Sequence, residues 1–314
     1  MTASEIVVPQ LDPDAAARAA EFGNLPSMRE RGLAAVRDGL ESAPLPEMPE
    51  MAEVHDRTID GPAGAIALRI YRPSTEIAGP AIVYFHGGGM VLGSNRSFEP
   101  LARNLAAHSD ATVISVDYRL APEAAPPAQF DDAYAATEWV LAHSDELRID
   151  GSRVAVAGDS AGGTLAAGVT LAARDRAAPQ LFAQVLMYPG VDRDLNAPSV
   201  LAMPNAPMLS LIDIKYMHEL ADGADHPYAV PARVRDLSGL PQAIVVTAEA
   251  DPIRDWGEHY AQRLRDAGVQ TTLTRYPGIY HGFMMRSETT ARGRLAVAEV
   301  GALLRAKFAH PIRF

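Results

Sequence analysis

Two glycine-rich motifs, each directly after a short apolar run, constrain this 314-residue chain more than any other feature. Residues 86–89 are His-Gly-Gly-Gly after the run 81–85, and residues 158–162 are Gly-Asp-Ser-Ala-Gly after the run 154–157. Such runs predict buried strands. The first motif is typical of a loop that holds an oxyanion, and the second of a strand-to-helix turn that exposes a serine nucleophile. Because the carboxyl ends of parallel strands share one sheet edge, we expect the two motifs to converge there.

The composition excludes several classes of protein. Hydrophobic residues make up 48% of the chain, which is enough for a substantial core, and the formal net charge is −11. This acidity argues against a nucleic-acid partner, since phosphate binding depends on clustered Lys and Arg. There is no Cys and no residue pattern typical of a metal site, so we expect neither metal nor cofactor. No signal peptide or membrane-spanning segment is visible, so we expect a cytoplasmic protein.

Short apolar segments alternate with helical ones, which predicts an α/β fold with a mostly parallel, eight-stranded sheet flanked by helices. The turn at residues 60–64 indicates that the sheet begins with an antiparallel pair. The expected strands are 53–58, 65–71, 81–85, 111–116, 153–157, 183–188, 243–248 and 270–276. The expected helices are 11–22, 27–40, 130–143, 161–174, 210–221, 255–267 and 289–307.

Two parts of the chain interrupt this alternation. Residues 51–189 and 240–314 are expected to form the α/β domain, and residues 190–239 an insertion above the sheet. Residues 1–50 are expected to add N-terminal helices, with Asp12 and Ser27 as N-caps. We expect the insertion and these helices to form a helical cap over the serine; the alternative is that both only cover the surface.

A serine hydroxyl needs an adjacent base to act as a nucleophile at neutral pH. Ser160 is the expected nucleophile, at the N-terminus of a helix whose dipole favours a developing anion. The backbone N–H groups of Gly88, Gly89 and Ala161 are the expected oxyanion donors, with Gly87 as an additional candidate.

Of nine histidines, only His281 follows a late strand in a loop with flanking glycines, so it is the expected base. We expect His86 to brace its loop instead. Three carboxylates after the strand 243–248 compete for the role of the acid. Glu249 still lies in or beside the strand, and Asp255 has the spacing of a helix capping box with residue 258. We therefore predict Asp251 as the acid.

These motifs, in this order, resemble the bacterial hormone-sensitive-lipase-type carboxylesterases of the α/β-hydrolase fold over about residues 65–305. The resemblance is carried by five segments: 86–89, 117–123 (Asp-Tyr-Arg-Leu-Ala-Pro-Glu), 158–163, 251–255 (Asp-Pro-Ile-Arg-Asp) and 281–283 (His-Gly-Phe). It implies a triad of Ser160, Asp251 and His281 and the oxyanion donors named above. It also implies a structural turn at 117–123, a cap, and a homodimer formed through residues 270–276 and 289–307.

Two residues depart from the family pattern and bear on selectivity. Met90 stands where an aromatic residue is common, and Trp256 replaces a frequent glutamate. We expect both to line the substrate pocket, together with Asp159 and Met208.

The expected function is that of a serine carboxylesterase that hydrolyses short- to medium-chain esters of small molecules through an acyl-enzyme. An amidase or deacetylase with the same triad is the first alternative. A non-catalytic small-molecule receptor on this fold is the second, and the complete triad disfavours it.

Overall fold

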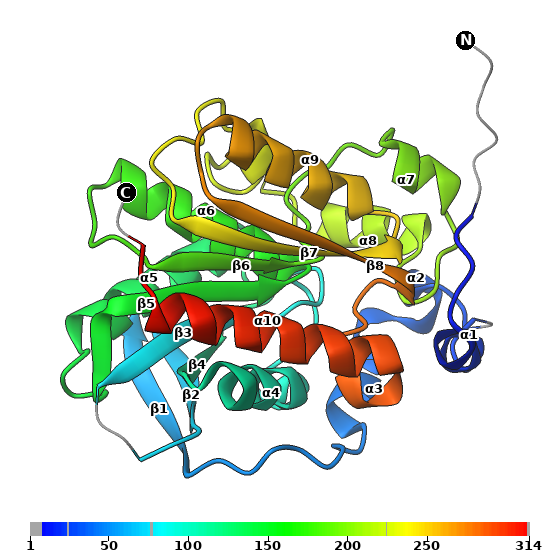
Figure 1. Ribbon diagram of the computed structural model, residues 1–314. Coiled ribbons are helices and arrows are strands. Elements are labelled where there is room, and N and C mark those ends of the chain that lie inside the picture. Colours follow the sequence, from blue (N-terminus) through cyan, green and yellow to red (C-terminus); the bar gives the residue numbers. More distant parts are fainter. Residues whose placement is uncertain (1–7, 24, 76–77, 224, 313–314) are drawn as a thin grey trace.

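The computed structural model describes residues 8–23, 25–75, 78–223 and 225–312, so residues 1–7 and 24 of the expected cap segment 1–50, and residue 224 of the expected insertion, lie outside the description. The described strands form one sheet in the order β1-β2-β4-β3-β5-β6-β7-β8 (Figure 1). Strands β3 to β8 are parallel to one another, and β2 is antiparallel to both of its neighbours. The strand bounds are β1 Glu53–Gly61, β2 Gly64–Arg72, β3 Gly79–Phe85, β4 Thr112–Asp117, β5 Ile149–Asp159, β6 Ala183–Met187, β7 Gln242–Ala250 and β8 Thr271–Tyr280. The predicted α/β-hydrolase fold with its antiparallel start is confirmed.

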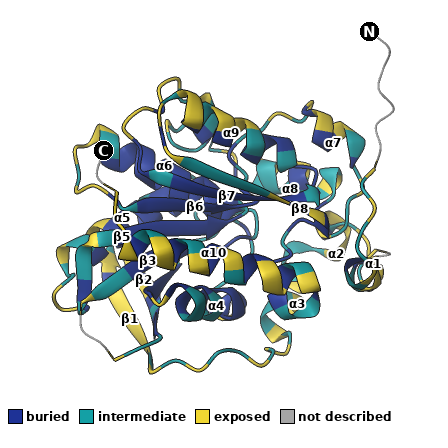
Figure 2. Ribbon diagram, viewed as in Figure 1, coloured by how far each residue is buried: buried dark blue, intermediate teal, exposed yellow. Residues whose placement is uncertain are grey.

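Helices cover both faces of this sheet. Helices α4 (Glu99–Ser109) and α10 (Ala291–Ala309) pack against each other on one face, in front of the sheet in Figure 1. Helices α5 (Ala128–Ala142), α6 (Ala161–Asp175) and α9 (Arg254–Asp266) cover the other. Central strands are therefore buried on both sides, which explains why they are continuous apolar runs, whereas edge strand β1 is largely exposed (Figure 2).

The helices differ from the prediction in three places, one of which is the unexpected five-residue helix α7 (Pro198–Ala202). Helix α4 was not expected, although Pro100 in its first turn and buried Leu101 and Leu105 four residues apart fit a helix. The expected helix 27–40 is divided by Gly32, whose φ of +81° ends α2 (Met28–Arg31) and begins α3 (Leu33–Ser42). Ser27 caps α2 in a capping box with Glu30, as its position predicted.

The remaining helices gather at one end of the sheet, on the right in Figure 1. They are α1 (Pro13–Ala20), α2 and α3 from the N-terminal segment, and α7 (Pro198–Ala202) and α8 (Leu211–Leu220) from the segment between β6 and β7; a short 3₁₀ turn, η1 (Pro231–Arg233), follows them. The two groups touch, since the Met28 N–H donates to Asp213 Oδ1 at 2.7 Å.

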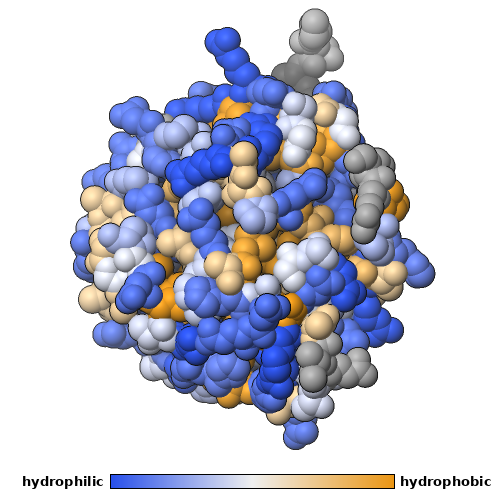
Figure 3. Space-filling model, turned by 90° about the vertical axis from the view of Figure 1, so that its left-hand side faces the viewer, coloured by the Kyte–Doolittle hydropathy of each residue, from blue (hydrophilic) through white to orange (hydrophobic). Residues whose placement is uncertain are grey.

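The opposite end of the molecule has a mixed surface, with hydrophilic residues around small hydrophobic areas (Figure 3). Among the described helices, none combines the length and apolar character that crossing a membrane requires.

Two glycines allow β3, β5 and α6 to meet. A Cβ on Gly158 would lie 2.1 Å from the carbonyl oxygen of Gly162, and a Cβ on Gly162 would lie 2.0 Å from that of Phe85. These neighbours are backbone atoms, which cannot rotate away. The turn at Ser160 therefore forms only without side chains at positions 158 and 162.

We predict that Gly162→Ala lowers the free energy of unfolding by about 1–3 kcal/mol or more, because the added methyl group overpacks the junction. The matched control is Gly39→Ala in α3, where a Cβ meets no atom within 4 Å; it should be neutral or stabilising by up to about 1 kcal/mol. Urea denaturation of both variants measures this. Equal stabilities of the two variants would contradict the assigned packing.

Candidate active site

Ser160 lies in the turn between β5 and α6 with φ 53° and ψ −118°, a backbone conformation that costs a non-glycine residue about 1–3 kcal/mol. The surrounding hydrogen bonds hold this conformation. The Ser160 N–H donates to Met187 O at 2.9 Å, and its carbonyl oxygen accepts from the Gly163 N–H at 3.0 Å. The hydroxyl is thereby presented at the carboxyl edge of the sheet.

Three side chains form one hydrogen-bonded chain at this edge. The Ser160 hydroxyl lies 2.9 Å from His281 Nε2, and His281 Nδ1 lies 2.8 Å from Asp251 Oδ2. Asp251 is fully buried, and its second carboxylate oxygen accepts the Ile253 N–H at 2.9 Å. The carboxylate thus fixes the imidazole with its Nδ1 protonated, which leaves Nε2 free to accept the serine proton.

The two other carboxylates considered as the acid have different partners. Glu249 accepts the Gly278 N–H at 3.0 Å. Asp255 accepts the Ser199 N–H at 2.8 Å and pairs with Arg254 at 2.9 Å, so it joins α7 to α9.

The predicted capping box of residues 255 and 258 is wrong. Helix α9 begins at Arg254 with Ile253 as its N-cap, which places Asp255 inside the first turn. Glu258 bonds to Thr247 Oγ1 and Arg275 instead.

The glycine loop, defined here as residues 86–95, follows β3 beside Ser160. Gly88 and Gly89 have φ values of 102° and 63°, which favour glycine. Within the described part of the chain, no protein acceptor takes the N–H of Gly88, Gly89 or Ala161. The Gly87 N–H is different, because it already donates to Asp159 Oδ1 at 2.9 Å. Gly87 is therefore not available as an additional oxyanion donor.

Asp159 lies beneath the glycine loop and not in the pocket wall, contrary to our expectation. Its Oδ1 accepts both the Tyr84 hydroxyl at 2.6 Å and the Gly87 N–H. Burial raises the pKa of Asp159 to about 6, and the two donors oppose this rise. The carboxyl therefore anchors the start of the loop to the end of β5.

His86 braces the same loop as a neutral ring. Its Nδ1–H donates to Gly87 O at 2.8 Å, and the ring stacks between Phe98 and Tyr118. Burial lowers the pKa of His86 to about 4, so the ring is uncharged at neutral pH. This ring supports the loop and does not act as a base.

A cavity of about 70 Å³ adjoins Ser160, Ala161 and Gly89. Met90 and Trp256 contribute to its wall, as expected, but Met208 does not and is 46% exposed. The other lining residues are Thr164, Gly190, Arg193, Leu209, Ile214, Met217, His218, Ala221, Ala229 and Ile253.

Four of these lining residues were not identified from the sequence as a set, although their spacing indicates one helix face. The first is Ile214, and the others follow it by three, four and seven residues along α8 and its C-cap: Met217, His218 and Ala221. The His218 ring stacks on Trp256, and burial lowers its pKa to about 4. One face of α8 therefore forms a wall with an uncharged histidine.

Among the described residues, no group of three or more His, Asp or Glu side chains is placed to hold a metal ion.

An α/β sheet with a Ser-His-Asp chain at its carboxyl edge is the architecture of the α/β-hydrolases. A family model described as alpha/beta hydrolase fold matches residues 82–285. The chain belongs to this family, in its hormone-sensitive-lipase-type group, which confirms the resemblance seen in the motifs.

Curated relatives and solved structures resemble this chain over most of its length. Esterase LipI of Mycobacterium tuberculosis is 40% identical over 285 residues, which cover 86% of this chain and 89% of that protein. Carboxylesterase NlhH of the same organism is 40% identical over 80% of this chain and 84% of its own length. A hyperthermophilic esterase from the archaeon Pyrobaculum calidifontis superposes with a TM-score of 0.88 at 37% identity, over 95% of this chain and 98% of that one.

We predict that Asp159 makes the stability of the protein fall as the pH rises from about 4 to about 6. Its raised pKa means that the folded protein binds the proton of this carboxyl more tightly than the unfolded chain does. The resulting stabilisation of the folded protein is present at low pH and lost above about pH 6. Asp159→Asn keeps an oxygen acceptor for the Tyr84 hydroxyl and the Gly87 N–H, and it should remove this pH-dependent part of the stability. Asp159→Ala leaves two buried donors unpaired and should cost about 1–3 kcal/mol for each.

Urea denaturation of wild type and both variants between pH 4 and 8 measures this contribution. The difference in unfolding free energy between Asp159→Asn and wild type should grow in favour of Asn as the pH rises. Parallel pH curves for the two proteins would show that Asp159 has no raised pKa.

Proposed function

We propose that the protein is a serine carboxylesterase whose nucleophile is Ser160, general base His281 and orienting acid Asp251. The observation that carries this proposal is the Ser160–His281–Asp251 hydrogen-bonded chain, which borders a small, mostly apolar cavity. Serine Oγ attacks the ester carbonyl carbon while its proton moves to His281 Nε2. The alcohol leaves with that proton, and water hydrolyses the acyl-enzyme by the same transfers in reverse.

Three backbone N–H groups supply the oxyanion hole in this proposal: those of Gly88, Gly89 and Ala161. They have no protein acceptor within the described chain, and the Ala161 N–H also lies at the N-terminus of α6, where the helix dipole is positive. Donors of this kind stabilise the tetrahedral intermediate more than the ester, and each is worth about 10²–10³ in kcat.

We predict that Ser160→Ala lowers kcat by about four orders of magnitude or more with the fold intact, because only the reacting hydroxyl is removed. Asp251→Asn should lower kcat by about 10⁴-fold, since the imidazole loses its required tautomer. The control Asp255→Asn should keep activity close to wild type and lose about 1 kcal/mol of stability, because it weakens only the contacts to Ser199 and Arg254.

Hydrolysis of p-nitrophenyl butyrate, with circular dichroism as the folding check, measures these effects. A folded Ser160→Ala protein with wild-type turnover would remove Ser160 from the mechanism. If Asp255→Asn were inactive and Asp251→Asn active, the acid would be misassigned.

We further propose that residues 1–50 and 190–239 act as a cap that limits the size of the acyl group. Supporting this, α8 contributes a wall of the cavity, and Met28 in α2 is bonded to α8. A second cavity of about 20 Å³ shares five lining residues with the first: Met90, Thr164, Arg193, Ala221 and Ala229. Met90 is therefore one of the residues that border both spaces.

We predict the highest kcat/KM for acyl chains of roughly two to eight carbons, because each methylene gains about 0.8 kcal/mol only while the cavity has room. Met90→Phe should shift this optimum to shorter chains, since the ring fills the junction of the two cavities. Met208→Phe is the matched control: Met208 has the same left-handed backbone, with φ 66° against 63°, but lies outside the cavity wall.

Rates with p-nitrophenyl esters from acetate to palmitate test this for the three proteins. A wild-type optimum at palmitate would contradict the small acyl pocket. If the two variants behaved alike, Met90 would have no role in acyl selection.

A further inference from the structure

The glycine loop is held in a strained conformation next to Ser160. Gly88, Gly89, Met90 and Gly93 all have φ between 63° and 102°. A non-glycine residue such as Met90 costs about 1–3 kcal/mol in this region, and such a backbone persists only where its surroundings hold it. The contacts that hold the loop therefore decide where the Gly88 and Gly89 N–H groups lie.

The α/β domain holds both ends of the loop, through Tyr118 at His86 O and Asp117 at the Asn95 N–H, and supplies two further contacts between these ends. Asp159 binds the Gly87 N–H, as described above. The Ala121 N–H donates to Met90 O at 2.9 Å. Neither contact involves the backbone carbonyl of Val91, the residue directly after Met90.

The N-terminal helix α3 supplies a third contact through Arg37. Its Nε donates to Val91 O at 2.7 Å and its Nη2 to Ala121 O at 2.7 Å. The guanidinium also forms a two-point pair with Glu123 at 2.7 and 2.9 Å, which lowers the pKa of Glu123 to about 2. The pair therefore stays charged across neutral pH. One planar group thus joins the glycine loop to the segment 121–123, a geometry that lysine cannot reproduce.

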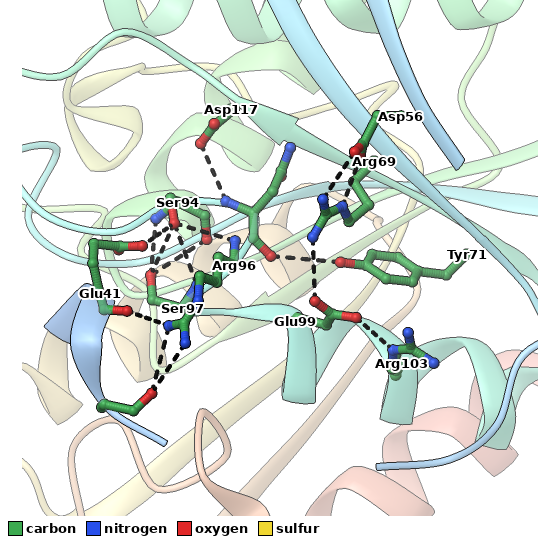
Figure 4. Close-up of polar contacts among 12 residues, drawn as sticks. Glu41, Asp56, Arg69, Tyr71, Ser94, Arg96, Ser97, Glu99, Arg103 and Asp117 are labelled. Carbon is green, nitrogen blue, oxygen red and sulfur yellow. Dashed lines mark hydrogen bonds and ion pairs between the residues drawn. The ribbon is translucent and has the colours of Figure 1, made fainter. Parts of the chain in front are cut away.

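Glu41, one turn further along α3, supplies a fourth contact. Its Oε2 accepts the Ser94 hydroxyl at 2.7 Å, and Arg96 donates back to Ala43 O just beyond the helix at 3.4 Å. Figure 4 shows the Glu41 carboxylate directed at Ser94. Helix α3 therefore binds the glycine loop at two places, Val91 and Ser94.

We propose that α3 positions the oxyanion hole, with Arg37 as the positioning residue that fixes the glycine loop through the Val91 carbonyl. This inference rests on the proposed roles of Gly88 and Gly89. A loop released at Val91 shifts the two N–H groups that precede it, and these groups contact the substrate oxygen most strongly when it carries negative charge. Loss of Arg37 therefore lowers kcat and leaves KM nearly unchanged.

The experiment compares Arg37→Met with the matched control Arg57→Met. Arg57, in β1 and outside the proposed cap, pairs with Glu146 and lies over Trp139, and makes no contact with the glycine loop in the described structure. Each protein is assayed for kcat and KM with p-nitrophenyl butyrate, well below its melting temperature. The inhibition constant of an aryl trifluoromethyl ketone, which forms an anionic tetrahedral adduct with serine, is measured alongside.

Arg37→Met should lose about 10- to 100-fold in kcat, a fraction of the effect of complete oxyanion-hole removal, with KM within about threefold. The inhibition constant should rise by a similar factor, whereas Arg57→Met should match wild type in all three quantities. Arg37→Lys keeps one donor for the Val91 carbonyl and should lie in between. If Arg37→Met does not fold, Arg37→Lys takes its place in the comparison with wild type and the control.

The inference would be overturned if a folded Arg37 variant kept wild-type kcat and inhibitor affinity and had only a lowered melting temperature. Arg37 would then only stabilise the fold. Equal losses in Arg37→Met and Arg57→Met would also overturn it. Failure of the proposed function is a separate result: it requires that wild type lack esterase activity or that Ser160→Ala retain it.

Discussion

The close approach of three backbone segments is the constraint on which this molecule depends. The end of β3, the end of β5 and the start of α6 meet at Gly158 and Gly162, where a single methyl group would overlap a carbonyl oxygen. That contact places the strained turn at Ser160 directly beside the glycine loop that follows β3. The proposed nucleophile and the proposed oxyanion donors are thus brought side by side by this packing junction, and the contacts from α3 act on a loop that the junction has already placed.

Beneath this junction lies a layer of buried polar groups that takes the place of hydrophobic packing. Tyr84 and Gly87 both donate to Asp159, and Tyr118 donates to His86 O at 2.8 Å. Buried polar groups are costly unless paired, but when paired they define one arrangement more strictly than apolar contacts do. A loop with several left-handed residues needs this kind of support.

The sequence was most informative where function depends on local backbone geometry. Strand ends and glycine motifs predicted the sheet. They also predicted that Ser160, Asp251 and His281 meet at one edge, because the carboxyl ends of parallel strands converge there. The sequence was least informative where contacts between distant parts of the chain decide what a side chain binds. Asp255 looked like a helix cap, yet its carboxylate binds Ser199, 56 residues earlier in the chain. Met208 looked like a pocket residue, yet the lining face of α8 begins at Ile214.

The N-terminal segment is fastened to parts of the chain that are synthesised last. The Asp12 N–H donates to Gly278 O at 2.7 Å, and its carboxylate pairs with Arg292 at 2.7 Å. These contacts span more than 260 residues, and contacts of such long range close late in folding because of the loop entropy they cost. During synthesis the contacts of Asp12 at the start of α1 can therefore form only after β8 and the first turn of α10 have been made.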